Sequence, residues 1–343
     1  MITEEARQLR DRFKGTLVGL GVGDAFGAPF EFLHTASIRK RYGGPVIEFL
    51  EESGGMVGPG EITDDTQMAL CIVDAILDSR DVDPGVIAGK FVQWLDSRPP
   101  DIGNLTRQVL VSIKLGRHWS LAARELWEAE GGNDPTRNPR ASNGSLMRCA
   151  PVGLFRHNDH ERLVADSIVT SAITHYDPRC TWSCVVLNML LSRNLARDAS
   201  VIPSTHAAAD LEDVANLVGN NSPVLREFLR ERARDITAVA SERESFEHVS
   251  MPFRDQGGYV LTSLGIALLS FYCTTTFKDA IITSANFGSD NDTTAAICGA
   301  LAGSYHGFSR IPLGWLAKLK QADLLERKAE AMLALITEKR GET

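Results

Sequence analysis

The spacing of apolar and polar residues predicts helices along almost the whole chain. Near its start, Phe13, Leu17, Leu20 and Phe26 fall on or near one face of a helix that covers residues 4–28. Strand-like alternation is not found, so the predicted fold class is all-α. The other segments with helical periodicity are 68–77, 86–95, a segment from about residue 106, 164–175, a set of peripheral helices over 182–247, a core helix within 259–272 and a C-terminal helix over 322–340.

Two stretches rich in glycine predict loops. Residues 34–60 contain Gly-Gly-Pro and Gly-Pro-Gly turns. Residues 131–145 are the most loop-like part of the chain, and a structureless loop of such length is usually functional or disordered. Because this loop runs directly into LMRCAPVGL, we expect Asn143, Gly144 and Ser145 to lie at the N-terminus of a helix. Backbone N–H groups in that position suit phosphate or another anion.

Glycine recurs every four residues in two segments that are far apart in the sequence. The first set is Gly15, Gly19, Gly23 and Gly27, and the second is Gly299, Gly303 and Gly307. Each glycine costs a helix about 1 kcal/mol relative to alanine, so a stripe of them indicates close approach of a neighbouring backbone. We expect the two helices to cross closely and bring the chain's ends together. That argues for a single domain over residues 1–343, although length alone would favour about two.

Two acidic clusters each open a helical pattern. Their oxygen-bearing residues are Thr63, Asp64 and Asp65 in GEITDDTQ, and Asp290, Asp292 and Thr293 in GSDNDTT. A single such aspartate is readily explained as a helix cap, because its oxygens accept free N–H groups and the helix dipole favours negative charge. Two clusters call for a shared reason. The simplest is convergence on one divalent-metal centre, since Mg2+ and Mn2+ prefer carboxylate and hydroxyl oxygens.

Four other polar residues each allow a structural and a functional interpretation. Asp24 lies in GLGVGDAFG, which resembles a phosphate loop but lacks the preceding strand, and a structural role is favoured. Glu31, between two phenylalanines, is either a surface residue or a functional acid. Asp101 is either a helix cap or part of a site, and His175 is either a packed core histidine or a substrate contact.

Composition limits the classes of function. The 343-residue chain is 43% hydrophobic and 23% charged, with a net charge of −8, which argues against a nucleic-acid-binding surface. No apolar signal segment and no apolar run of ~20 residues is present, so neither secretion nor membrane insertion is expected. The six cysteines form no CxxC pair, and most of them are expected to be small buried thiols in a cytoplasmic protein. Cys180 and Cys184 lack the further ligands that zinc requires.

Several motifs in order give the chain a resemblance to a known family. They are GDAFGAPFEF, GEITDDTQMAL, PPDIGNLTR, SNGSLMRCAPVG, THYDP, GGYVLTSL and NFGSDNDTTAAICGALAGSYHG. The chain resembles the ADP-ribosylglycohydrolase family, in particular its bacterial dinitrogenase reductase-activating type. The resemblance implies a single all-α domain with two Mg2+ or Mn2+ ions. It also implies cleavage of the glycosidic bond between ADP-ribose and a modified residue, most often arginine.

The resemblance assigns expected roles to individual residues. The implied metal ligands are Thr63, Asp64, Asp65, Asp290, Asp292 and Thr293. Asp101 and Glu31 match residues that act at the scissile bond or gate the site. The residues expected to line the ADP-ribose site are Asn143, Gly144, Ser145, His175, Gly258 and Tyr259. Two positions depart from the family pattern. Ser289 stands before the last pair of aspartates, and no metal ligand is lost by it. Thr262 and Ser263 stand where an acidic residue is often found, which affects the expected contacts to the leaving group.

The expected partner is an ADP-ribosylated protein or an ADP-ribosyl small molecule, and the chain is expected to be a monomer. Alternatives that the sequence leaves open are hydrolysis of serine-linked ADP-ribose, hydrolysis of a small ADP-ribosyl compound, and a non-catalytic ADP-ribose-binding module. A two-metal phosphoesterase is disfavoured, because the sequence lacks His-rich ligand clusters.

Overall fold

The computed structural model describes residues 3–51, 55–132, 134, 141–197, 201–253 and 257–341. Within these ranges the regular structure is helical, and β-pairing is limited to two isolated bridges, His34 with Gly288 and Ser142 with Tyr259. The all-α prediction is therefore confirmed. The longer helices are α1 (Glu4–Gly27), α3 (Asp64–Ser79), α4 (Pro84–Asp96), α5 (Asn104–Lys114), α6 (Trp119–Ala129), α8 (His160–Ala172), α9 (Pro178–Ala196), α10 (Ser204–Val218), α11 (Pro223–Ala240), α13 (Val260–Tyr272), α14 (Phe277–Ala285), α15 (Asn291–His306) and α17 (Ala322–Gly341).

Short helices join these elements. They are η1 (Ala28–Phe30), α2 (Thr35–Tyr42), α7 (Ala150–Phe155), α12 (Phe246–Ser250), η2 (Met251–Phe253), η3 (Phe308–Arg310) and α16 (Leu313–Lys318). The prediction that residues 34–60 are loop throughout is wrong, because α2 lies within them. Of the eight residues in α2 only Ile38 is buried, so the helix carries almost no apolar periodicity.

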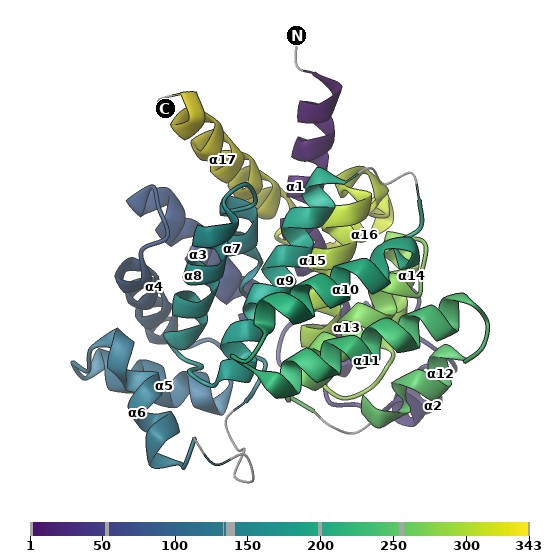
Figure 1. Ribbon diagram of the computed structural model, residues 1–343, viewed down its shortest axis with the longest axis horizontal. Helices are drawn as coiled ribbons and strands as arrows, with labels where there is room; N and C mark the ends of the chain where they lie inside the picture. The colour runs from purple at the N-terminus through teal and green to yellow at the C-terminus, as the bar shows by residue number, and fades with distance from the viewer. Residues whose placement is uncertain are drawn as a thin grey trace.

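Helices α1 and α15 pack against each other in antiparallel directions at the centre of the molecule (Figure 1). A Cβ atom added to Gly15 would overlap the carbonyl oxygen of Gly303, and one added to Gly19 would overlap that of Gly299. At the other end of the contact, a Cβ on Gly27 would lie 2.5 Å from the carbonyl oxygen of Asn291. The predicted close crossing is confirmed, and it places the end of α1 beside the start of α15.

Helix α9 belongs to the core, so its assignment to the peripheral helices is wrong. Nearly every residue of α9 is buried, including polar ones. The amide of Asn188 donates to Ser167 over 2.9 Å, and that of Asn194 donates to Ser304 over 2.9 Å. Polar residues satisfied by internal partners make a buried helix look amphipathic in the sequence.

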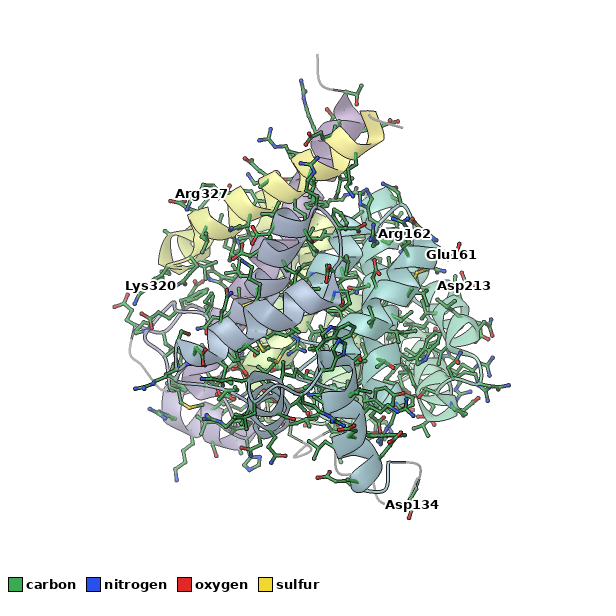
Figure 2. The ribbon with its side chains drawn as sticks, turned by 90° about the vertical axis from the view of Figure 1, so that its left-hand side faces the viewer. Asp134, Glu161, Arg162, Asp213, Lys320 and Arg327 are labelled. Atoms are coloured by element: carbon green, nitrogen blue, oxygen red, sulfur yellow. The ribbon has the colours of Figure 1, made fainter. Side chains whose placement is uncertain are left out.

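Helices α10 and α11 do lie at the periphery, one beside the other at the front of the molecule (Figure 1). The C-terminal helix α17 is also confirmed, and it packs on α1 and α3 through a buried stripe that includes Leu325 and Met332. Arg327 is exposed on the outer side of this helix (Figure 2). No helix in the described part of the chain combines the length and apolarity that a membrane crossing requires.

The glycine contact predicts a large loss of stability on a small substitution. We expect Gly19→Ala to lower the free energy of unfolding by about 3 kcal/mol, because the new methyl group meets backbone that has no room to move. The measurement is urea denaturation followed by circular dichroism.

The matched control is Gly89→Ala in the interior of α4, where an added Cβ meets nothing within 4 Å. This variant should gain about 0.5–1 kcal/mol, because alanine restricts the unfolded chain. Equal effects at the two positions would contradict the close helix contact.

Candidate active site

A cavity of about 1090 Å³ lies where the end of α1 meets the starts of α3 and α15. Residues from widely separated segments line it, and most of the predicted site residues are among them. These are Glu31, Asp64, Asp65, Asp101, Asn143, Gly144, His175, Gly258, Tyr259, Asp290 and Thr293. Thr63, Asp292 and Ser145, which are almost fully buried, do not line the cavity.

Helix α3 begins directly at the cavity, and a buried aspartate of α1 fixes its first turn. Thr63 is the N-cap residue, and Asp64 and Asp65 form the first turn. The carboxylate of Asp24 accepts hydrogen bonds from the backbone N–H of Thr63 at 3.0 Å and from that of Thr66 at 3.1 Å. Burial raises the pKa of Asp24 to about 6 even though these bonds act to lower it. Asp24 thus joins α1 to α3, in agreement with its structural interpretation.

Asp65 connects the two acidic clusters. Its Oδ2 accepts a hydrogen bond from the hydroxyl of Thr293 at 3.3 Å and lies 3.3 Å from the hydroxyl oxygen of Thr63. Its Oδ1 is buried and has no hydrogen-bond partner among the described residues. A buried carboxylate oxygen without a partner is costly in a folded protein, so this atom is suited to a cation.

Three carboxylates from different parts of the chain converge in the same place. Glu31, Asp101 and Asp292 each offer an oxygen atom, and the three atoms lie within 4.8 Å of one another. Asp101 does not cap α5, whose N-cap is Gly103, so the cap interpretation of Asp101 is wrong. Glu31 follows η1 and faces the cavity, as expected for a functional acid.

The concentrated negative charge shifts the proton affinities of these groups. Burial, reinforced by neighbouring carboxylates, raises the pKa of Glu31 to about 9 and that of Asp64 to about 8. The same causes raise the pKa of Asp65 and of Asp292 well above the usual range. Within the described ranges no ion pair joins any of these groups to a lysine or arginine. So many like charges are stable together only when protons or cations neutralise them.

The segment before α7 forms the opposite wall. The side-chain amide of Asn143 donates to Ser263 and to Asp290, both at 2.8 Å, and its backbone N–H donates to the carbonyl of Gly258 at 3.0 Å. The prediction that residues 143–145 begin a helix is wrong. They form a turn, and α7 starts at Ala150, with a proline at its first turn.

His175 is both packed and in contact with the cavity. It is 1% exposed, and a Cβ on Gly144 would lie 3.0 Å from its ring carbon Cε1. Burial and the nearby Arg148 lower its pKa well below the usual range, so the ring is neutral. Ser145 lies behind this wall, where its hydroxyl oxygen accepts a hydrogen bond from Ser171 at 2.8 Å.

Sequence reasoning missed several lining residues, including Phe32, Thr106, Ser142 and Met147. Phe32 is 60% exposed beside Glu31 and has a φ of 57°, which is unusual for a residue other than glycine. Its N–H donates to the carbonyl of Ser289 at 2.7 Å. Nothing in the local sequence signals this geometry, because it depends on pairing with a segment near the other end of the chain.

Comparison with known proteins identifies the family of the chain. The sequence profile of the ADP-ribosylglycohydrolase family matches residues 5–342, and the chain belongs to that family. It is therefore a hydrolase of glycosidic bonds.

Individual relatives cover nearly the whole chain. The ADP-ribosylarginine hydrolase Tri1 of Serratia proteamaculans is 30% identical over 96% of this chain and 80% of its own. The ADP-ribosyl-[dinitrogen reductase] glycohydrolase of Rhodospirillum rubrum is 31% identical over 95% of this chain and 97% of its own. A solved structure described as an ADP-ribosylglycohydrolase-related protein complex has a TM-score of 0.69 and 26% identity, covering 96% of this chain and 99% of the other.

The buried carboxylates predict a pH-dependent stability when divalent cations are removed. The pKa values of Glu31 and Asp64 are about 9 and about 8 in the folded state, against 4.5 and 3.8 without the fold. The folded chain therefore binds more protons than the unfolded chain between these limits. The resulting stabilisation is complete below the unfolded pKa and is lost as the pH rises through the folded pKa.

We expect the urea midpoint measured in chelator to fall as the pH rises from about 5 to about 9. Glu31→Gln should flatten this fall. The control Asp213→Asn, whose side chain is 60% exposed on α10, should leave it unchanged. A flat profile for the unaltered protein would show that the carboxylates are not buried together.

Proposed function

We propose that this protein hydrolyses the N-glycosidic bond between ADP-ribose and an arginine side chain. The observation that carries the proposal is the convergence of oxygen atoms of Glu31, Asp101 and Asp292 within 4.8 Å of one another, next to a cavity that Asp64 and Asp65 also line. Two relatives that act on ADP-ribosyl-arginine or ADP-ribosylated dinitrogen reductase by name support the choice of substrate. The cavity, at about 1090 Å³, is large enough for a ligand of this size.

The donor atoms fit a pair of hard divalent cations. All are carboxylate or hydroxyl oxygens, and one of them, Oδ1 of Asp65, is buried without a partner among the described residues. The residues that would hold two Mg2+ or Mn2+ ions are Thr63, Asp64, Asp65, Asp290, Asp292 and Thr293. When bound, such ions would supply orientation of the ribose hydroxyls and a lowered pKa for a bound water.

Glu31 and Asp101 are suited to handle the proton of the leaving group. Guanidine leaves as a strong base, so its protonation assists cleavage. Without cations, burial and neighbouring carboxylates raise the pKa of Glu31 to about 9, and burial raises that of Asp101, so the protein environment favours the protonated form that a general acid needs. Both groups lie at the cavity beside Asp292. Either one can donate to the departing nitrogen, and afterwards accept a proton from water.

The carboxylates also favour the charge that develops on the sugar. Breaking the anomeric bond gives an oxocarbenium-like transition state, which carries positive charge. Carboxylates of the site that stay ionised stabilise such charge without having to reorganise. The remainder of ADP-ribose would lie along the opposite wall, against Asn143, Gly144, His175, Gly258 and Tyr259.

The role of Asp292 is tested by its removal. We expect Asp292→Ala to reduce release of ADP-ribose from an arginine-modified protein roughly 100-fold or more, since the loss of even an outer partner of a metal ligand costs roughly 10–100-fold. The assay is run with Mn2+ or Mg2+ and with chelator, and the control is Asp213→Ala on α10. Near-normal turnover of Asp292→Ala would remove the metal assignment.

The role of Asp101 is tested by separating binding from rate. Asp101→Asn should lower turnover roughly 10²–10⁴-fold while the affinity for ADP-ribose persists, because a general acid acts only in the transition state. Loss of affinity along with rate would reassign Asp101 to structure.

Parallel assays on peptides carrying serine-linked ADP-ribose show whether the arginine linkage is preferred, and equal or faster cleavage of serine peptides would overturn that choice.

A further inference from the structure

A string of hydrogen bonds runs from a buried arginine to the cavity wall through Arg148, Thr174, His175 and Ser142. We propose that this string fixes the hydroxyl of Ser142 as a hydrogen-bond donor to an oxygen of the ADP-ribose moiety. Arg148 and Thr174 are then positioning residues that act through His175. The inference rests on the proposed function, because it takes the cavity's ligand to be ADP-ribose.

The string begins at a guanidinium that can only donate. Arg148 is 1% exposed, and its guanidinium lies over the ring of Phe91, 4.3 Å from the ring centre. Its Nη1 donates to the sulfur of Met68 at 3.2 Å, and its Nη2 donates to Oγ1 of Thr174 at 2.6 Å. Arginine has no acceptor atom, so the oxygen of Thr174 is the acceptor in this bond.

The second bond sets the tautomer of His175. Oγ1 of Thr174 lies 2.7 Å from Nδ1 of His175, and this is the other hydrogen-bond contact of that hydroxyl among the described residues. Because the oxygen already accepts from Arg148, its single hydrogen is free to point to Nδ1. A neutral imidazole that accepts at Nδ1 carries its proton on Nε2.

The third bond determines the direction in which the hydroxyl of Ser142, at the cavity, can donate. Nε2 of His175 lies 2.9 Å from Oγ of Ser142, and with its proton there it donates to the serine oxygen. The hydroxyl hydrogen of Ser142 then has no acceptor among the described residues. Since Ser142 lines the cavity, that hydrogen is available to a ligand oxygen there.

The string is tested by calorimetric binding of ADP-ribose to the full chain and its variants. Ser142→Ala should weaken binding roughly tenfold, as expected for the loss of one ordered hydrogen bond. Thr174→Val should weaken it in the same direction, and Thr174→Ser should restore it. In the Ser142→Ala background, Thr174→Val should have no further effect, because both changes break one string.

A matched control lies one turn earlier on the same stretch of chain. Thr170 is 2% exposed, and its hydroxyl has no partner among the described residues, so Thr170→Val removes a buried hydroxyl that is outside the string. This variant should bind ADP-ribose as the unaltered protein does.

The tautomer of His175 can be measured directly. The ¹⁵N shifts of His175 should report a proton on Nε2 in the unaltered protein and a changed tautomer population in Thr174→Val.

The outcomes separate this inference from the proposed function. Additive effects of Ser142→Ala and Thr174→Val, or a proton on Nδ1, would overturn the string. Unchanged ADP-ribose affinity in Ser142→Ala would also overturn the string. If the unaltered protein still hydrolysed its substrate in that case, the proposed function would stand. Binding with the expected dependence but no hydrolysis would support the string and defeat the proposed activity. No binding of ADP-ribose at all would overturn both.

Discussion

The backbone contact between α1 and α15 is the constraint on which the site depends. Helices with ordinary side chains at their interface lie about 8–10 Å apart, and the glycines let these two approach more closely. The contact continues to Gly27 and Asn291, at the end of α1 and the start of α15. Glu31 and Asp292, which are far apart in the sequence, are therefore brought within reach of each other.

The fold holds a set of like charges that would separate if the elements could move. Rigid packing of α1 on α15 and the hydrogen bonds of Asp24 to the first turn of α3 prevent this. The starts of α3 and α15 also supply favourable dipoles to the aspartates that they carry. The resulting excess of buried negative charge favours both proton retention and cation binding, which are the properties that glycosidic cleavage of ADP-ribose would use.

The sequence predicted tertiary contacts correctly where the same residue type recurs at a fixed spacing for one structural reason. The glycine stripes indicated the helix contact, and the clusters around Asp64 and Asp292 indicated one acidic centre. It was misleading where polar residues are satisfied inside the fold. Asn188 and Asn194 made α9 look peripheral, although their partners are buried serines of other helices. The turn at Asn143 looked like a helix start for a related reason, since its partners lie on α13 and beside α15.

The sequence by itself determined the helical class and the close approach of α1 to α15, because periodicity and spacing act locally along the chain. Half of the residues that line the cavity were indicated by its acidic clusters and by the resemblance that its motifs carry. Tertiary structure alone decided which groups share a hydrogen bond across long separations. The backbone conformation of Phe32 depends on the hydrogen bond of its N–H to Ser289. The string from Arg148 to Ser142 forms only because separate segments of the chain meet. Such pairings follow from packing distances and donor directions, and neither quantity is encoded in the spacing of residues along one helix.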